Sequence, residues 1–121
     1  MMSDMKLHTH WNGLTATTTL REHLERRLAF ALGRFGEEIH HVSARVADLN
    51  GPKGGIDKLV SLRVHGRRLK SLVVTDADAN LFAAIDRAAD RIGRAIGRTL
   101  ERGNSRSRRD KALRLHAARS R

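Results

Sequence analysis

Arginines recur at regular intervals in the second half of the sequence. They are spaced four, three, four and four residues apart, which places them in one band of an α-helix about 80° wide and roughly 22 Å long. The members of this arginine ladder are Arg87, Arg91, Arg94, Arg98 and Arg102. A guanidinium is planar, permanently charged and able to donate two hydrogen bonds to a phosphate. The ladder can therefore follow a nucleic-acid backbone.

An ordinary solvated helix face is the alternative explanation of the arginine ladder. Opposite charges do not alternate along it, because Asp86 and Asp90 lie to its sides, and it contains no lysine. Like charges on neighbouring turns destabilise a helix unless a partner neutralises them. We therefore predict that this face binds RNA. An earlier amphipathic segment contributes further basic residues to the predicted binding set, namely Arg26, Arg27 and Arg34.

Histidines form a second group of residues that could bind a metal or take part in catalysis. His8 and His10 share one face of a predicted strand, and His40, His41 and His65 could lie near them. Imidazole is a common metal ligand, but no cysteine or carboxylate stands at matching spacing, so we expect no metal site. We interpret these residues as imidazoles on an exposed sheet face, where they could also touch RNA. No nucleophile triad, phosphate-binding loop or carboxylate pair is apparent, so we predict a protein without enzymatic activity or cofactor.

The composition narrows the class of protein further. The 121 residues suffice for one domain, and 24 basic against 13 acidic residues give a formal net charge of +11, which attracts polyanions. The absence of cysteine suits a reducing cytosol. The sequence contains neither a signal peptide nor an apolar run of membrane-spanning length, so we expect a cytoplasmic protein with no membrane partner. The aromatic residues are too few for base stacking, which favours recognition of RNA backbone and shape.

Four segments are predicted to be β-strands because apolar and polar residues alternate in them or β-branched residues predominate. They are Met5–Trp11, Ile39–Asp48, a segment around Val60–Val64, and Arg68–Thr75. His65-Gly66 provides a short turn between the last two, which implies antiparallel pairing.

Two segments show the three-to-four-residue apolar spacing of amphipathic helices. The first starts at about Thr18, with Thr17 and Thr19 as equally good N-caps, and ends between Gly33 and Gly36. The second runs from Asn80 to about Arg102 and carries the arginine ladder. Asp76 and Asp78 offer helix caps for it.

The element order predicts an α+β fold of the type β-α-β-β-β-α. A right-handed crossover makes the first two strands parallel, and the resulting four-stranded mixed sheet packs both helices on one face, as in a double-stranded-RNA-binding domain. We expect residues 1–102 to form this domain. Residues 103–121 carry seven basic residues and one acid, and we interpret them as a flexible basic C-terminal tail that is helical around Ala112–Ala118 once bound. The tail accounts for +6 of the charge, which leaves +5 on the domain.

The segments Thr17–Leu24 (TTTLREHL) and Asn80–Asp86 (NLFAAID), together with this element order, resemble the ribosome hibernation promoting factors. These proteins are also called ribosome-associated inhibitors or sigma-54 modulation proteins. The resemblance spans about residues 5 to 102. It implies binding to the small (30S) ribosomal subunit and its 16S rRNA, in the channel of messenger and transfer RNA, so that idle ribosomes stay inactive in stationary phase or stress.

The resemblance also implies that the arginine ladder occupies the basic positions of the family's second helix and grips rRNA phosphates. The chain departs from the family in three ways: arginine largely replaces lysine, the loop Gly51–Gly55 is glycine-rich, and the tail is basic. We expect a short-form member without the dimerisation domain of the long form, so pairing of ribosomes and blocking of single ribosomes both stay open. We expect a monomer off the ribosome and no small-molecule substrate.

Three other functions are compatible with parts of the sequence. A general double-stranded-RNA module has the same layers but starts with a helix, whereas this chain starts with a strand. A small histidine-dependent nuclease or metal hydrolase would use His8 and His10. A regulator of the sigma-54 modulation type would bind another protein, such as RNA polymerase, in place of the ribosome.

Overall fold

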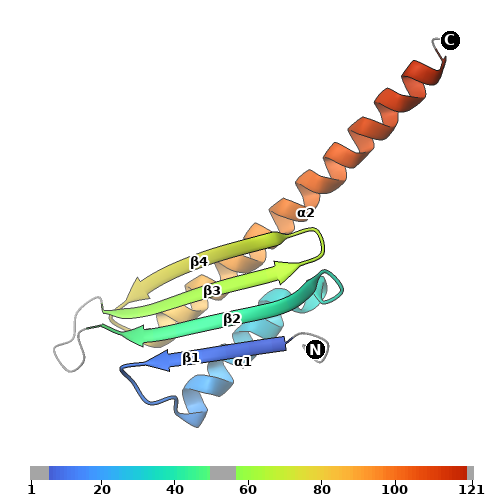
Figure 1. Ribbon diagram of the computed structural model, residues 1–121. Helices are drawn as coiled ribbons and strands as arrows, with labels where there is room; N and C mark the ends of the chain where they lie inside the picture. Colours follow the sequence, from blue (N-terminus) through green and yellow to red (C-terminus); the bar gives the residue numbers. More distant parts are fainter. Residues whose placement is uncertain (1–5, 50–56, 120–121) are drawn as a thin grey trace.

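A computed structural model describes residues 6–49 and 57–119 of the chain. Its elements follow the predicted order β-α-β-β-β-α (Figure 1). They are β1 (Lys6–Asn12), α1 (Thr18–Leu32), a short 3-10 turn η1 (Gly33–Phe35), β2 (Ile39–Asp48), β3 (Lys58–Gly66), β4 (Lys70–Asp78) and α2 (Leu81–Arg119). The expectations for the Gly51–Gly55 loop fall on residues outside the described ranges.

The four strands form one mixed sheet in the order β1-β2-β3-β4. β1 runs parallel to β2, while β2, β3 and β4 pair antiparallel, as their short connections require. Both helices lie behind the sheet in Figure 1, and the other face is open. The predicted α+β class, with two helices on one face of a four-stranded sheet, is therefore confirmed.

The core lies between the sheet and the two helices. Alternation along β2 and β3 sends every second side chain inward, and the helices supply one apolar stripe each. The fully buried side chains include Leu24, Leu28, Leu32, Val42, Val46, Val60, Leu62, Val64, Ile85, Ile92 and Ile96. Complete burial of such a side chain stabilises the fold by about 1.5–3 kcal/mol. These stripes fix which sides of α1 and α2 face solvent.

Helix α1 begins after Thr17, whose Oγ1 accepts a hydrogen bond from the backbone N–H of Leu20 at 3.2 Å. This contact selects Thr17 over Thr19 as the N-cap. The α-helix ends at Leu32, one residue before the predicted interval, and η1 continues as a 3-10 turn to Phe35, inside that interval.

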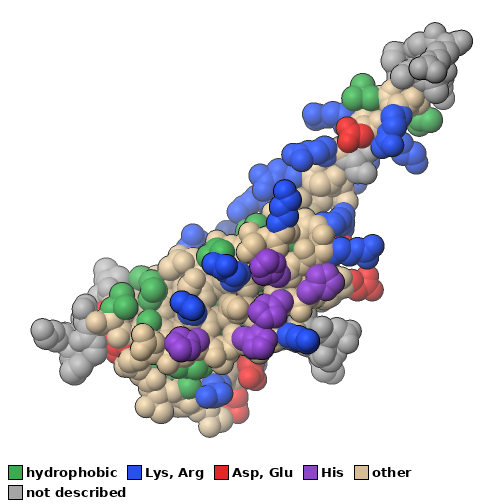
Figure 2. All heavy atoms as spheres, viewed as in Figure 1, with side chains coloured by type: hydrophobic (Ala, Val, Ile, Leu, Met, Phe, Trp, Pro, Cys, Tyr) green, Lys and Arg blue, Asp and Glu red, His purple; other side chains and the backbone are tan. Residues whose placement is uncertain are grey.

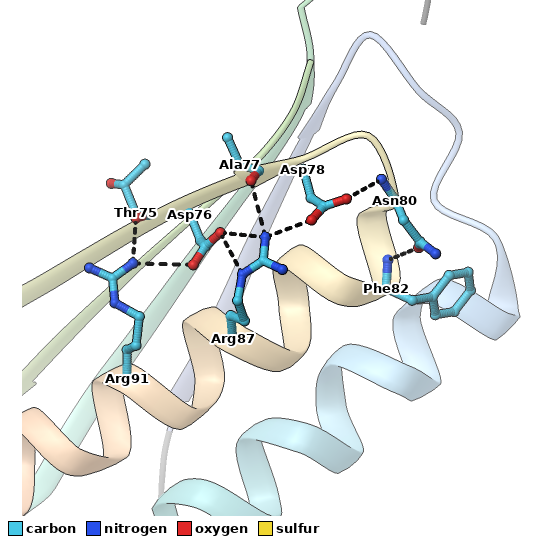
Figure 3. A network of polar contacts seen from close by, with 8 residues as sticks. All are labelled: Thr75, Asp76, Ala77, Asp78, Asn80, Phe82, Arg87 and Arg91. Atoms are coloured by element: carbon cyan, nitrogen blue, oxygen red, sulfur yellow. Dashed lines mark hydrogen bonds and ion pairs between the residues drawn. The ribbon is translucent and has the colours of Figure 1, made fainter. Parts of the chain in front are cut away.

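Strand β4 extends to Asp78, three residues beyond its predicted end. The prediction that Asp76 and Asp78 cap α2 was wrong. Asn80 takes this role, because its Oδ1 accepts from Phe82 N at 2.9 Å, while Asp78 Oδ1 accepts from Asn80 N at 2.8 Å (Figure 3). Pairing with β3, which places Asp78 opposite Lys58, keeps both aspartates in the strand.

Helix α2 continues past its predicted end at Arg102 as far as Arg119. Gly103 weakens a helix by only about 1 kcal/mol relative to alanine, and the arginines, lysine, alanine and leucine that follow are good helix formers. The extension projects from the domain in Figure 1. The boundary predicted at residue 102 therefore has no break in secondary structure, and the flexibility of residues 103–121 stays a prediction.

Candidate nucleic-acid interface

The first two arginines of the ladder, Arg87 and Arg91, contact the edge strand β4 of the sheet. Arg87 donates through Nη2 to Asp76 Oδ1 at 2.9 Å, to Asp78 Oδ2 at 2.7 Å and to the carbonyl of Ala77 at 3.1 Å. Arg91 donates through Nη1 to the carbonyl of Thr75 at 2.9 Å and to Asp76 Oδ2 at 3.2 Å (Figure 3). We call these residues, Thr75, Asp76, Ala77, Asp78, Arg87 and Arg91, the edge clamp.

The edge clamp is internally balanced in charge. Hydrogen bonds from Arg87 lower the pKa of Asp76, with Arg91 adding to the effect, and the backbone N–H of Asn80 followed by Arg87 lowers that of Asp78. Both carboxylates raise the pKa of Arg87. The clamp also occupies two alternate carbonyls of the edge strand β4, which would otherwise offer a template to another strand. Arg87 and Arg91 thus hold α2 to β4, a role that their helical spacing did not reveal.

The rest of the ladder is directed to solvent. Arg94 pairs with Asp90 at 2.8 Å one turn earlier, but both side chains are well exposed, and such pairs contribute little to stability. Arg98 and Arg102 are exposed, and neither has an ion pair or hydrogen bond within the described parts of the chain. Their charge is available to a partner.

A groove between α1 and α2 brings together arginines that are far apart in the sequence. It is lined by Arg27, Phe30, Ala31, Arg34, Asp90, Gly93 and Arg94. Gly93 allows the close approach of the helices, because a Cβ there would lie 3.1 Å from the carbonyl oxygen of Ala31. We call this the interhelical groove. It joins Arg27 and Arg34 of α1 to the solvent-facing part of the ladder, whereas Arg26 is exposed outside its lining.

Aromatic rings accompany the groove arginines. Phe30 is 84% exposed, and the guanidinium of Arg27 lies 5.8 Å from its ring centre. Arg34 lies 4.6 Å from the ring centre of Phe35. A ring so exposed at a basic groove offers a stacking surface for a base. Its exposure was not predicted from the sequence, although Phe30 lies off the apolar stripe of α1.

Asp86 links the two helices beside the groove. Its Oδ1 lies 2.7 Å from Nε2 of His23 and 3.2 Å from Nε of Arg27. The ring of His23 also meets Phe82 edge-on, at a centre-to-centre distance of 5.0 Å. Arg27 is therefore partly neutralised and held in place, while Arg34 has no acidic partner among the described residues.

The predicted histidine cluster lies on the open face of the sheet. The rings of His8 and His41 are 4.6 Å apart, and β-sheet register places His65 opposite His41. His40 precedes His41 at a register irregularity near the start of β2. Over residues 6–49 and 57–119, no three histidine, cysteine or acidic side chains are grouped so that they could hold a metal ion. No helix in these ranges is long and apolar enough to cross a membrane.

Fold and surface together define a small basic α+β domain whose helical face carries the exposed arginines. A family model described as "Sigma 54 modulation protein / S30EA ribosomal protein" matches residues 7–104. The chain belongs to this family, the family of ribosome hibernation factors, and the resemblance noted in the sequence is confirmed.

Solved structures agree with this assignment. The N-terminal domain of Thermus thermophilus Protein Y superposes with a TM-score of 0.64 at 26% identity, over 78% of this chain and 98% of that one. A ribosomal subunit interface protein from Coxiella burnetii gives a TM-score of 0.58 at 13% identity, over 78% and 93% of the two chains; it supports the fold alone. No curated protein sequence matches significantly.

Proposed function

We propose that this protein is a non-enzymatic hibernation factor that binds the small ribosomal subunit through phosphates of its 16S rRNA. Bound there, it blocks the channel of messenger and transfer RNA and keeps idle ribosomes inactive in stationary phase or stress. The observation that carries the proposal is the continuous run of exposed arginines from the interhelical groove along α2, in a member of this family.

We assign the phosphate contacts to the arginines that lie free of the edge clamp. They are Arg26, Arg27, Arg34, Arg94, Arg98 and Arg102. Arg87 and Arg91 lie at the end of the same helix face, but Asp76 and Asp78 already balance their charge. We therefore assign them chiefly the positioning of α2, with any phosphate contact requiring exchange of a carboxylate partner.

The description of the family, which names a ribosomal protein, agrees with a location on the ribosome. A protein with this role acts in the cytoplasm and needs no cofactor or small-molecule substrate. We propose that it is monomeric off the ribosome, because its exposed helical face is strongly basic and repels a second copy. The basic helical extension beyond Arg102 adds charge that can follow RNA outside the domain's footprint.

The test is co-sedimentation of the purified protein with separated ribosomal subunits on sucrose gradients, at low and moderate salt. The double variant Arg94→Glu with Arg98→Glu reverses two exposed charges without touching the edge clamp. The control, Arg67→Glu with Lys70→Glu, makes the same charge change at the exposed β3–β4 turn.

Salt-sensitive migration with the small subunit, lost in the ladder variant and kept in the turn variant, supports the proposal. Equal loss in both variants would mean that only net charge matters and would refute the assigned surface. Wild-type protein that stays at the top of every gradient would refute ribosome binding itself.

A further inference from the structure

The open face of the sheet is basic as well, and no acidic side chain occupies it in the described strands. The outward positions are Lys6, His8, His10 and Asn12 of β1, His41, Ser43, Arg45 and Ala47 of β2, Leu59, Ser61, Arg63 and His65 of β3, and Ser71, Val73, Thr75 and Ala77 of β4. Figure 2 shows the blue and purple side chains gathered on this face. We call it the sheet face. It lies opposite the interhelical groove and shares no residue with it.

Strand register arranges these side chains in four rows across the sheet, and three of the rows carry the charged and titratable residues. One row is Lys6, His41, His65 and Ser71; the next is His8, Ser43, Arg63 and Val73; the third is His10, Arg45, Ser61 and Thr75. Neighbouring strands are about 4.8 Å apart. Each of these three rows thus combines at least one cationic or titratable side chain with a hydroxyl group.

The middle of the sheet face is hollowed at its arginines. One hollow is lined by Ser43, Arg45, Ser61 and Arg63. A second, which shares Arg45 and Ser61 with the first, reaches Thr75 of β4 on one side and His10 and Asn12 of β1 on the other. Guanidiniums beside hydroxyl donors are groups that bind phosphate oxygens. Neither Arg45 nor Arg63 has an ion pair or hydrogen bond within residues 6–49 and 57–119, so both can donate to a ligand.

We propose that the sheet face is a second RNA-binding surface, which contacts a phosphate backbone through Arg45, Arg63 and Lys6 and binds more tightly as its histidines take up protons. The RNA identity of the polyanion rests on the proposed function; the surface itself does not. With the arginines of the helix face on the opposite side, the domain would then lie between two RNA segments.

The imidazoles of the sheet face have no acidic neighbour on that face that would offset their charge. His8, His10, His41 and His65 face Lys6, Arg45 and Arg63, and no described element packs over them. Among the acids at the two ends of the sheet, Glu38 pairs with Arg68, and Asp48 and Asp57 pair with Lys58. With no carboxylate on the face to offset it, each added proton strengthens attraction to phosphate. A free imidazole changes its charge between about pH 5 and 8.

The experiment measures binding of a fluorescein-labelled RNA hairpin by fluorescence anisotropy at about pH 6 and pH 8 and equal ionic strength. Three full-length variants are compared with wild type. The first replaces His8, His10, His41 and His65 by glutamine, the second is Arg45→Gln with Arg63→Gln, and the third is the helix-face pair Arg94→Glu with Arg98→Glu. Circular dichroism at both pH values checks that each variant is folded.

We expect wild type to bind at least about fivefold more tightly at pH 6 than at pH 8, from two or more imidazole–phosphate contacts of the strength of surface ion pairs. The histidine variant should match wild type at pH 8 and lose the pH dependence. The arginine variant should bind more weakly at both pH values, and the helix-face variant should keep the pH dependence at reduced affinity.

An unchanged pH dependence in the histidine variant would overturn the proposal, because other groups would then be responsible. Variants that weaken ribosome co-sedimentation but not hairpin binding would also overturn it, since the sheet face would then meet a ribosomal protein. Hairpin binding with the expected pH dependence, but no sedimentation with the small subunit, would support the sheet face while refuting the proposed function.

Discussion

Removal of the Asp76 carboxylate tests the edge clamp. Asp76 is 11% exposed and accepts three hydrogen bonds, from Arg87 Nε at 3.1 Å, Arg87 Nη2 at 2.9 Å and Arg91 Nη1 at 3.2 Å. In Asp76→Asn the side chain keeps its shape but loses its charge and part of its acceptor capacity. Arg87 and Arg91 then face a neutral amide, so the negative charge of Asp76 no longer offsets their positive charges.

The size of the effect follows from the exposure of the partners. A hydrogen bond to a charged group contributes about 1.5–3 kcal/mol when it is buried. Here both guanidiniums are about half exposed, so water replaces much of what the carboxylate supplied, and Asp78 still accepts from Arg87. We expect the free energy of unfolding to fall by about 1–2 kcal/mol in total, and Tm by about 4–8 °C.

Thermal and urea unfolding followed by circular dichroism at neutral pH measure this loss. The control is Asp90→Asn, which removes a carboxylate from an exposed pair with Arg94 and should change stability by less than about 0.5 kcal/mol. If Asp76→Asn is no more destabilising than Asp90→Asn, the clamp does not hold α2 to β4 and our explanation of Arg87 and Arg91 is wrong.

The same variant has a defined pH signature. Because the pKa of Asp76 is lowered in the folded protein, its contribution is fully present above the unfolded-state value of about 3.9. It is lost as pH falls through the lower folded-state value. The stability difference between wild type and Asp76→Asn should therefore be constant near neutrality and shrink in acid. A difference that grows as pH falls below about 4 would contradict the sign of the shift.

Three further changes have expected results. Thr17→Ala should lower the free energy of unfolding by about 1 kcal/mol through loss of the N-cap, with Thr19→Ala as the weaker control in the same urea titration. Gly66→Ala should destabilise by more than about 2 kcal/mol, since its Cβ would clash with the backbone carbonyl oxygen of Glu38, whereas Gly33→Ala meets nothing within 4 Å and should be tolerated. Arg102→Gln should reduce the slope of log affinity against log salt for RNA by about 0.9 if this side chain neutralises one phosphate; an unchanged slope would remove it from the interface.

Much of the fold could be predicted from the sequence because helices and strands give apolar residues a characteristic local periodicity. Alternation predicted the bounds of β2 to the residue, and the apolar stripes predicted which sides of α1 and α2 are buried. The ends of β4 and α2 were predicted less well. Pairing with β3 extends the strand through Asp78, and the helix passes Gly103, Asn104 and the serines that follow because each weak helix former costs no more than about 1 kcal/mol.

The candidate site, like the fold, was predictable from the sequence only in part. The helical spacing of the arginines, the excess of positive charge and the family resemblance are properties of the sequence alone. Only the tertiary structure decided that Arg87 and Arg91 turn to Asp76 and Asp78 at the β4 edge, because this depends on how α2 crosses the sheet.

The tertiary structure likewise placed Arg27 and Arg34 beside Arg94 in one groove and aligned histidines and arginines of three strands on the sheet face. Sequence periodicity predicts on which face of its helix or strand a residue lies. The register between strands and the packing of one helix on another determine which residues of different elements meet, and both are set by the whole core.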